Sequence, residues 1–216
     1  MIAVIGGTGK LGRGLVARLA KSGEKVIIGS RTPKKAERTA SELSEKTNAE
    51  ILGAGNEEAT RKSEIIFLSV PYKGINGILD QINPALNSSK IVVSTIVPLS
   101  FKEGEVNLIN PGSESAAEEI ASNLPNDIPV VSAFQTVSAN SMRDIENPLN
   151  SDIPICGDNE DAKTKVGELI NKLSGTNPID VGPLSNSNLI ESLGVLLVDL
   201  SLRHKSKGAG VRFEGI

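Results

Sequence analysis

The sequence is poor in the residues that most often transfer protons or bind metals in enzymes. Its 216 residues include one histidine (His204), one cysteine (Cys156), one tyrosine (Tyr72) and no tryptophan. A single cysteine excludes a disulfide within the chain, which favours a reducing, cytoplasmic location. No group of histidine, cysteine and carboxylate residues has the spacing of a metal site. Because aromatic residues make up only 2% of the chain, the core must be largely aliphatic.

The chain also lacks a strong net charge and a long hydrophobic run. Its formal net charge is -3, which gives no electrostatic reason to bind nucleic acid or an anionic membrane surface. No apolar run is long enough to span a bilayer. The opening residues MIAVIGG lack a basic region, so we expect a first strand there rather than a signal peptide. Small molecules are therefore the expected ligands.

Short aliphatic runs alternate with longer amphipathic segments over the first two thirds of the chain. This alternation predicts a parallel sheet with helices on both faces, and the right-handed crossover rule makes it a doubly wound α/β sheet of the Rossmann type. We expect strands over residues 2–7, 25–30, 49–53, 64–70, 90–97 and 128–134, and helices over 11–23, 33–46, 74–83 and 115–124.

A second, smaller α/β unit is expected after residue 135. Its predicted elements are a strand over 153–156, a helix over 160–173, a strand over 178–181 and a helix over 186–204. We therefore divide the chain into a Rossmann domain, residues 1–135, and a small C-terminal domain, residues 136–216. The last helix is apolar on more than one face, which predicts burial at the domain junction or in a homodimer interface.

The first predicted strand leads into a glycine-rich turn that opens a helix. Gly7, Gly9 and Gly12 give the pattern G-x-G-x-x-G, which in this context is the dinucleotide-binding fingerprint. We expect Gly7 to allow the tight turn, Gly9 to let the backbone approach a diphosphate, and Gly12 to let the helix pack close to the sheet. The free N–H groups and positive end of that helix would face the diphosphate.

Gly6, Gly9 and Gly12 also match the glycine spacing of short-chain dehydrogenase relatives. Classical members of that group need a Tyr-x-x-x-Lys pair. Tyr72 is followed four residues later by Asn76, so the chain is not a classical member.

The end of the second predicted strand lacks the acid that NAD-binding folds use to hold the ribose 2′-hydroxyl. Ser30 and Arg31 stand there instead, followed by Lys34 and Lys35 on the first helical turn. A guanidinium, a hydroxyl and ammonium groups are suited to phosphate oxygens. The pattern therefore predicts NADP rather than NAD, with Lys34 and Lys35 as alternatives at the 2′-phosphate.

Three further strand ends are expected at the same edge of the sheet, and none carries Asp, Glu, Lys or His. They are residues 69–71, 96–98 and 134–136. Carbonyl reduction needs a proton as well as a hydride, and so needs a general acid or base within reach. Hydride exchange between two cofactors requires none from the protein, because the rings carry the chemistry. An acid-free crevice favours that second kind of reaction.

Seven stretches, in order over nearly the whole chain, resemble the NADP-dependent reductases of the deazaflavin coenzyme F420, a family found mainly in archaea and some bacteria. They are GGTGKLGRGL (6–15), GSRTPKKAE (29–37), SVP (69–71), KIVVSTIVP (90–98), VVSAFQTVSA (130–139), PICGD (154–158) and GPLSNSNLIESL (182–193). The resemblance implies reversible, direct hydride transfer between NADP(H) and F420, with the nicotinamide C4 facing the deazaflavin C5.

The resemblance also implies roles for individual residues. The diphosphate would lie along Thr8, Gly9, Lys10 and Leu11, and the 2′-phosphate would be held by Ser30, Arg31 and Lys35. The nicotinamide and the ring junction would lie along Val70, with Pro71 beside it, and along Val97 and Ala139; Ala209 of the C-terminal tail would lie near the deazaflavin. Gln135 stands where some relatives have a histidine, and a glutamine cannot titrate.

Two other functions stay open on the sequence. One is an NADP-dependent reductase of another small acceptor, such as an imine, a flavin or a metal chelate. The other is a non-enzymatic NADP-binding redox sensor.

The remaining polar residues have plain structural interpretations. We expect His204 to end a helix, where a cation is favourable. Cys156 is expected to be a small buried residue rather than a nucleophile. Ser115 and Glu118 form a capping-box pattern, with Ser113 and Glu114 close to the same helix start and open to a substrate-closing role.

Overall fold

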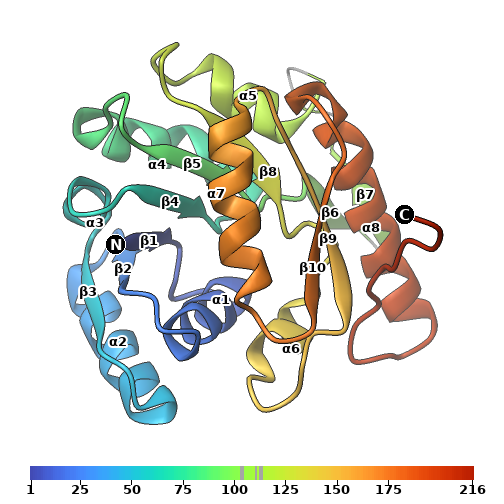
Figure 1. Cartoon of the computed structure of the whole chain (residues 1–216), viewed down its shortest axis with the longest axis horizontal. Coiled ribbons are helices and arrows are strands. Elements are labelled where there is room, and N and C mark those ends of the chain that lie inside the picture. Colours follow the sequence, from blue (N-terminus) through green and yellow to red (C-terminus); the bar gives the residue numbers. More distant parts are fainter. Residues whose placement is uncertain (103–104, 110, 112–113) are drawn as a thin grey trace.

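The computed structural model describes residues 1–102, 105–109, 111 and 114–216. Figure 1 shows one mostly parallel sheet with helices on both faces. The helices are α1 (Lys10–Lys21), α2 (Pro33–Thr47), α3 (Asn56–Arg61), α4 (Ile75–Ile82), α5 (Ala116–Ser122), α6 (Ala139–Arg143), α7 (Glu160–Asn171) and α8 (Ser187–Arg203). The strands are β1 (Ile2–Ile5), β2 (Val26–Ser30), β3 (Ile51–Gly55), β4 (Ile65–Leu68), β5 (Ile91–Ser94), β6 (Leu99–Lys102), β7 (Glu105–Leu108), β8 (Val130–Ala133), β9 (Ser151–Gly157) and β10 (Thr176–Asp180).

Within the described residues, eight strands form one sheet in the order β10-β9-β8-β5-β4-β1-β2-β3. The six strands predicted for residues 1–135 are all present, and the pairs that they form with one another are all parallel. The order of these six, β3-β2-β1-β4-β5-β8, is the Rossmann order, so the predicted fold class is confirmed.

The sheet continues beyond residue 135. Strand β9 pairs antiparallel with β8, with Ser132 opposite Cys156, and β10 pairs in parallel with β9. The strands and helices expected for the C-terminal segment are present, and the two strands extend the same sheet. The division into domains 1–135 and 136–216 stays a prediction.

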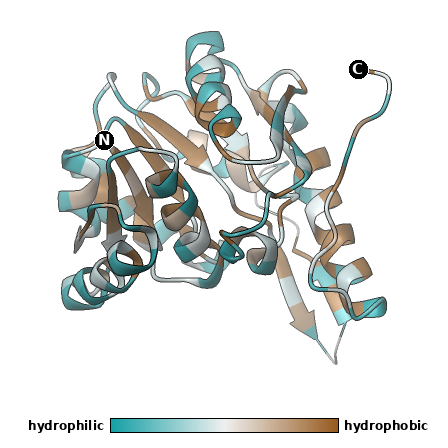
Figure 2. Ribbon diagram, turned by 60° about the horizontal axis from the view of Figure 1, so that its bottom comes forward, coloured by the Kyte–Doolittle hydropathy of each residue, from teal (hydrophilic) through white to brown (hydrophobic). Residues whose placement is uncertain are grey.

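Two apolar cores lie on opposite faces of the sheet because side chains alternate along each strand. Ile2 and Val4 of β1 face one core, which also takes the buried residues of α1, α2 and α7. Ala3 and Ile5 face the other, which takes those of α3, α4 and α5. Figure 2 shows the resulting contrast between hydrophobic strands and hydrophilic outer helix faces. Each fully buried aliphatic side chain contributes about 1.5–3 kcal/mol.

Helix boundaries follow the expected local signals in most places. Helix α2 begins with Pro33 in its first turn, and the left-handed Asn48 (φ 52°) ends it. Helix α5 begins at the Ser115 cap, whose hydroxyl accepts from the Glu118 N–H at 3.1 Å and donates to the Glu118 carboxylate at 2.8 Å. His204 caps the C-terminus of α8, as predicted. Ser113 lies outside the described residues.

Two α-helices and two strands in the described residues were not expected from the sequence. They are helix α3, the short helix α6, and the strands β6 and β7, which pair as an antiparallel hairpin. The hairpin contacts α8, and its Phe101 side chain is 64% exposed. None of the described helices is long and apolar enough to cross a membrane.

Candidate active site

The turn between β1 and α1 is shaped by glycines at positions where a side chain would collide with backbone. Gly6 has a left-handed backbone (φ 80°), and a Cβ there would lie 2.3 Å from the Ser69 carbonyl oxygen. The Gly9 N–H closes the turn by donating to the Gly6 carbonyl at 2.9 Å. Gly6, rather than Gly7, therefore has the positive φ in this turn.

Gly7 and Gly12 permit close packing inside the turn. A Cβ on Gly7 would lie 2.9 Å from the Val4 carbonyl oxygen, and one on Gly12 would lie 2.5 Å from the Gly6 carbonyl oxygen. Gly12 thus lets α1 approach the turn, as expected from the fingerprint. Gly9 differs, because a Cβ there would meet just one of the described atoms within 4 Å, the Gly6 oxygen at 3.2 Å. The space next to Gly9 is free to take a ligand.

The N-terminus of α1 is ready to bind an anion. The first N–H groups of a helix have no partner within it, and the cap residue Gly9 has no side chain to accept from them. Thr8 and Leu11 are half-buried, whereas Gly9 and Lys10 are exposed. Backbone donors, the positive end of the helix dipole and the Lys10 ammonium group together fit a diphosphate.

The end of β2 carries the predicted phosphate-binding residues. Ser30 is half-buried, and its hydroxyl accepts from the Thr32 N–H at 3.2 Å. Arg31, Lys34 and Lys35 are exposed. Among the described residues, none of these three cations forms an ion pair, so the groups are available to an incoming phosphate.

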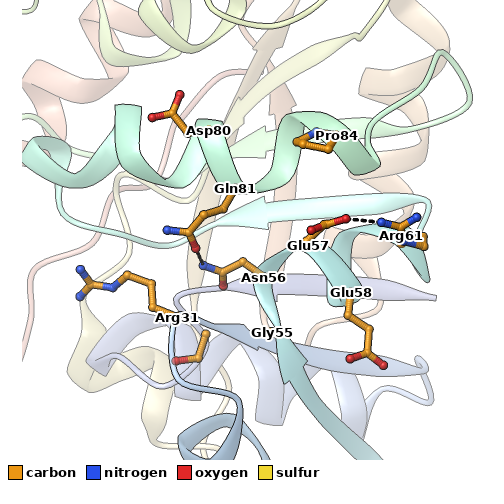
Figure 3. Close-up of a pocket in the computed structure, with 10 residues that line it drawn as sticks. Arg31, Gly55, Asn56, Glu57, Glu58, Arg61, Asp80, Gln81 and Pro84 are labelled. Carbon is orange, nitrogen blue, oxygen red and sulfur yellow. Dashed lines mark hydrogen bonds and ion pairs between the residues drawn. The ribbon is translucent and has the colours of Figure 1, made fainter.

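A cavity of about 510 Å³ opens beside Ser30 and Arg31. Figure 3 shows its other walls, contributed by the end of β3, by α3 and by the end of α4. On the far wall, the Asn56 amide donates to the Gln81 side-chain oxygen at 2.8 Å. The acids Glu57 and Glu58 are paired with Arg61 and Lys62 one turn later. A third acid, Asp80 of α4, also lines the cavity and forms no ion pair among the described residues. Arg31 lies on the same cavity, so a phosphorylated ribose would meet its guanidinium there.

The predicted nicotinamide contacts lie at the ends of adjacent strands. Val70 follows β4 and touches the glycine turn, because a Cβ on Gly6 would lie 2.8 Å from its Cγ1. Val97 follows β5 and approaches α8, where a Cβ on Gly194 would lie 3.1 Å from its Cγ2. Both valines are half-buried, and Pro71 beside Val70 is exposed. Together they give an apolar wall at the carboxyl edge of the sheet.

The C-terminal tail is brought to the same region as Ala139. Ala139 is the first residue of α6, and its neighbour Asn140 donates to the Lys207 carbonyl at 2.9 Å. A Cβ on Gly208 would lie 1.9 Å from the Ser138 hydroxyl oxygen. Ala209 is fixed by its own N–H, which donates to the Ser201 hydroxyl at 2.8 Å. Thus residues far apart in the sequence meet here.

Among the described residues, the strand ends near this wall carry no free acid or base. Gln135 is buried, and its amide N–H groups donate to the Ser94 carbonyl and the Ser132 hydroxyl, both at 2.9 Å. Cys156 is buried as predicted, and desolvation raises its pKa to about 12. No group of three or more His, Cys, Asp or Glu residues in the described part of the chain could hold a metal ion.

One buried acid was not anticipated from the sequence. Glu191 of α8 is 1% exposed, and its carboxylate accepts from the backbone N–H groups of Ala116 and Ala117 at 2.9 and 3.1 Å. Desolvation nevertheless raises the pKa of Glu191 to about 7. Because the carboxylate is used to join α8 to α5, it serves the structure rather than an open crevice.

Comparison with known sequences identifies relatives that use NADP and F420. A family model described as "NADP oxidoreductase coenzyme F420-dependent" matches residues 1–98. The F420-dependent NADP reductase of Methanocaldococcus jannaschii is 39% identical, and the alignment covers 100% of this chain and 98% of that protein. The F420-dependent NADP reductase of Methanothermobacter marburgensis is 36% identical with the same coverage. The rat metalloreductase STEAP3 is 30% identical over 89% of this chain, which spans 36% of that longer protein.

Solved structures support the fold. A crystal structure described as an F420-dependent NADP-reductase from Arthrobacter sp. FB24 superposes with a TM-score of 0.84, at 24% identity and 98% coverage of both chains. The imine reductase BcSIRED from Bacillus cereus gives a TM-score of 0.62 at 21% identity, covering 88% of this chain and 57% of that one.

Proposed function

Because the chain belongs to the family of F420-dependent NADP reductases, we propose that it catalyses reversible, direct hydride transfer between NADP(H) and the deazaflavin coenzyme F420. The observation that carries this proposal is the spatial order of four features along one edge of the sheet. The phosphate-binding residues follow β2, the glycine turn follows β1, Val70 follows β4 and Val97 follows β5. The strands stand side by side in that order, β2-β1-β4-β5.

An extended dinucleotide has the same order of chemical groups. Ser30, Arg31 and Lys35 hold the 2′-phosphate, and the cavity beside them receives the adenosine. The turn from Gly7 to Gly12 binds the diphosphate, through Thr8, Gly9, Lys10 and Leu11. The nicotinamide then reaches the wall formed by Val70, Pro71 and Val97. The fit rests on the open space at Gly9 and on the uncapped N-terminus of α1.

The protein contributes alignment and exclusion of water rather than proton transfer. When bound, the nicotinamide and the deazaflavin supply the redox chemistry themselves. Val70, Val97 and Ala139 provide small apolar surfaces on which a flat ring can lie, and Ala209 of the tail closes the same region. Holding two reacting atoms at contact distance accounts for much of the rate of such a reaction. No general acid at the strand ends is required.

An NADP-dependent reductase of an imine, a flavin or a metal chelate is the second candidate. The fold shared with imine reductases and the identity to a metalloreductase favour it. The absence of a free acid or base among the described strand ends argues against an acceptor that must be protonated during the reaction. A non-enzymatic NADP-binding redox sensor is the third candidate.

One assay separates the three. The purified protein is mixed with NADPH and oxidised F420, and the visible absorption band of the deazaflavin is followed. We expect bleaching that matches NADPH oxidation mole for mole. Turnover with free flavin, a cyclic imine or a ferric chelate, and none with F420, would support the second candidate. NADPH binding without turnover of any acceptor would support the sensor.

Residues 1–135 form the NADP-binding part in this proposal, and residues 136–216 complete the deazaflavin site and provide the interface of a homodimer. The outer face of α8 supports the interface, because Leu189, Leu196 and Leu202 are 66%, 51% and 50% exposed. Exposed apolar patches of this kind commonly mark interaction sites. Sedimentation should give the mass of two chains, and Leu196→Asp should give that of one. The lone, buried Cys156 is in keeping with the cytoplasm as location.

A further inference from the structure

Helix α6 needs support from outside its own residues. It has only five residues, Ala139–Arg143, and a helix of that length is not stable alone. Its first residue is Ala139, assigned above to the ring-binding wall. The C-terminal tail also rests on its N-terminal end, through Asn140 and Ser138. Any displacement of α6 would therefore move both Ala139 and the tail.

A single buried arginine ties α6 to the nucleotide-binding helix. Arg18 of α1 is 5% exposed and donates to four backbone carbonyl groups at distances of 2.5–3.0 Å. The carbonyls belong to Ser141, Met142, Asp144 and Asn147, in the last turn of α6 and the segment that follows. The carbonyls of Ser141 and Met142 lie in the last turn of α6, where carbonyl groups have no partner within the helix.

The packing around Arg18 brings α1 and α6 into backbone contact. A Cβ on Gly14 of α1 would lie 2.6 Å from the Met142 carbonyl carbon, and the Met142 side chain is fully buried. Lys21, one turn after Arg18, donates to the Ile145 carbonyl at 3.2 Å. The N-terminus of the same helix α1 binds the diphosphate in the proposed function. Helix α1 therefore fixes α6 relative to the nucleotide.

We propose that Arg18 is a positioning residue for hydride transfer, which sets Ala139 and the tail at the right place relative to the bound nucleotide. The inference rests on the proposed function. A planar guanidinium holds its donors in a rigid, extended fork that reaches carbonyl groups both in α6 and in the segment after it, whereas a lysine ammonium holds its three donors at a single point. The role is thus specific to arginine.

Lys90 offers a matched control. It is also a buried cation (6% exposed) that donates to backbone carbonyls, those of Thr60, Arg61 and Ser63. It precedes β5, at the edge of the sheet opposite to the crevice. Lys90→Met should therefore destabilise the fold in the same chemical way as Arg18→Met, without moving α6.

The experiment compares Arg18→Met, Arg18→Lys and Lys90→Met with the wild type, well below their unfolding temperatures. We expect Arg18→Met to lower kcat/KM for F420 by about tenfold or more, because displacements of about 1 Å at a reacting centre have effects of that size. The Kd of NADPH should stay within about twofold, because the glycine turn and Ser30 are untouched. The kcat/KM of Arg18→Lys should lie between those of Arg18→Met and the wild type, and Lys90→Met should keep the wild-type kcat/KM.

Amide hydrogen exchange gives a readout that does not depend on turnover. In Arg18→Met, amides of residues 139–147 and 207–209 should exchange faster, while those of 56–61 should not; Lys90→Met should show the reverse. Equal loss of kcat/KM in Arg18→Met and Lys90→Met, or unchanged exchange at 207–209 in Arg18→Met, would overturn the inference. If the wild type itself fails to reduce F420, the proposed function is wrong, and hydrogen exchange still decides the role of Arg18 in placing the tail.

Discussion

Replacing Arg31 by alanine should remove most of the preference for NADP over NAD. Arg31 is exposed at the end of β2 and has no ion-pair partner among the described residues, so its guanidinium is free to meet a 2′-phosphate. A hydrogen bond to a charged group contributes about 1.5–3 kcal/mol, and exposure to solvent favours the lower end of that range. About 1.4 kcal/mol corresponds to tenfold in Kd. We therefore expect the Kd of NADPH to rise about tenfold in Arg31→Ala.

The NADH titration makes the prediction specific. NADH carries a ribose hydroxyl in place of the phosphate, so its Kd should change by less than about twofold, as for an uncharged contact. Both constants can be measured by the fluorescence of the bound reduced nicotinamide. Raising the ionic strength should reduce the ratio between the Kd of NADH and the Kd of NADPH in the wild type, because salt screens exposed charges.

Arg38→Ala is the matched control, because Arg38 is an exposed arginine on helix α2, close to Arg31 in the sequence, and its guanidinium is already paired with Glu42. Arg38→Ala should leave the Kd of NADPH and the Kd of NADH unchanged. An equal weakening of NADPH and NADH in Arg31→Ala would contradict the assignment, and so would an unchanged Kd for NADPH.

Three further predictions concern the turn and the buried groups. Gly12→Ala should lower the free energy of unfolding by about 1–3 kcal/mol and abolish tight NADPH binding, because its Cβ would lie 2.5 Å from the Gly6 oxygen. Thermal unfolding measures the change in stability. In that assay the control variant Gly77→Ala, at an open position of helix α4, should be more stable than the wild type. The pKa of Glu191 rises from 4.5 to about 7 on folding, so the folded state binds its proton more tightly, and about 3 kcal/mol of stability should be lost as the pH rises through 7. Denaturant titrations at pH 5 and pH 8 should show this loss in the wild type and not in Glu191→Gln. Cys156 should resist a thiol reagent until the protein is unfolded, because it is fully buried with its pKa raised to about 12; labelling of the native protein would contradict its burial.

The alternation of strands and helices could be predicted because each buried strand is a continuous aliphatic run. The direction of β9 could not. All seven of its residues are buried, so its sequence lacks the alternation of polar and apolar residues that would indicate an antiparallel strand. Helix α3 was missed because NEEATR is short and buries little apolar surface beyond Ala59. The hairpin β6–β7 is largely exposed and lacks a clear buried face.

The candidate nucleotide-binding residues could be proposed from the sequence because their chemistry is local. Glycines before a helix, and a serine and an arginine after a strand, indicate phosphate at short range. The roles of Arg18 and Glu191 could not be found in this way. Arg18 contacts carbonyl groups more than 120 residues away in the sequence. Because every residue has a backbone carbonyl, no residue type indicates such a partner. Glu191 meets two backbone N–H groups that lie over 70 residues away.

The central claim is that the hydride passes directly between the two cofactors. It is tested most directly with NADPH that carries deuterium at the transferable C4 position. The wild-type protein is incubated with this NADPH and oxidised F420, and the reduced deazaflavin is isolated and examined by mass spectrometry and NMR. Direct transfer predicts one deuterium at C5 of the deazaflavin and none released to water. Reduced deazaflavin that carries only protium at C5, with the label recovered in the solvent, would contradict the account.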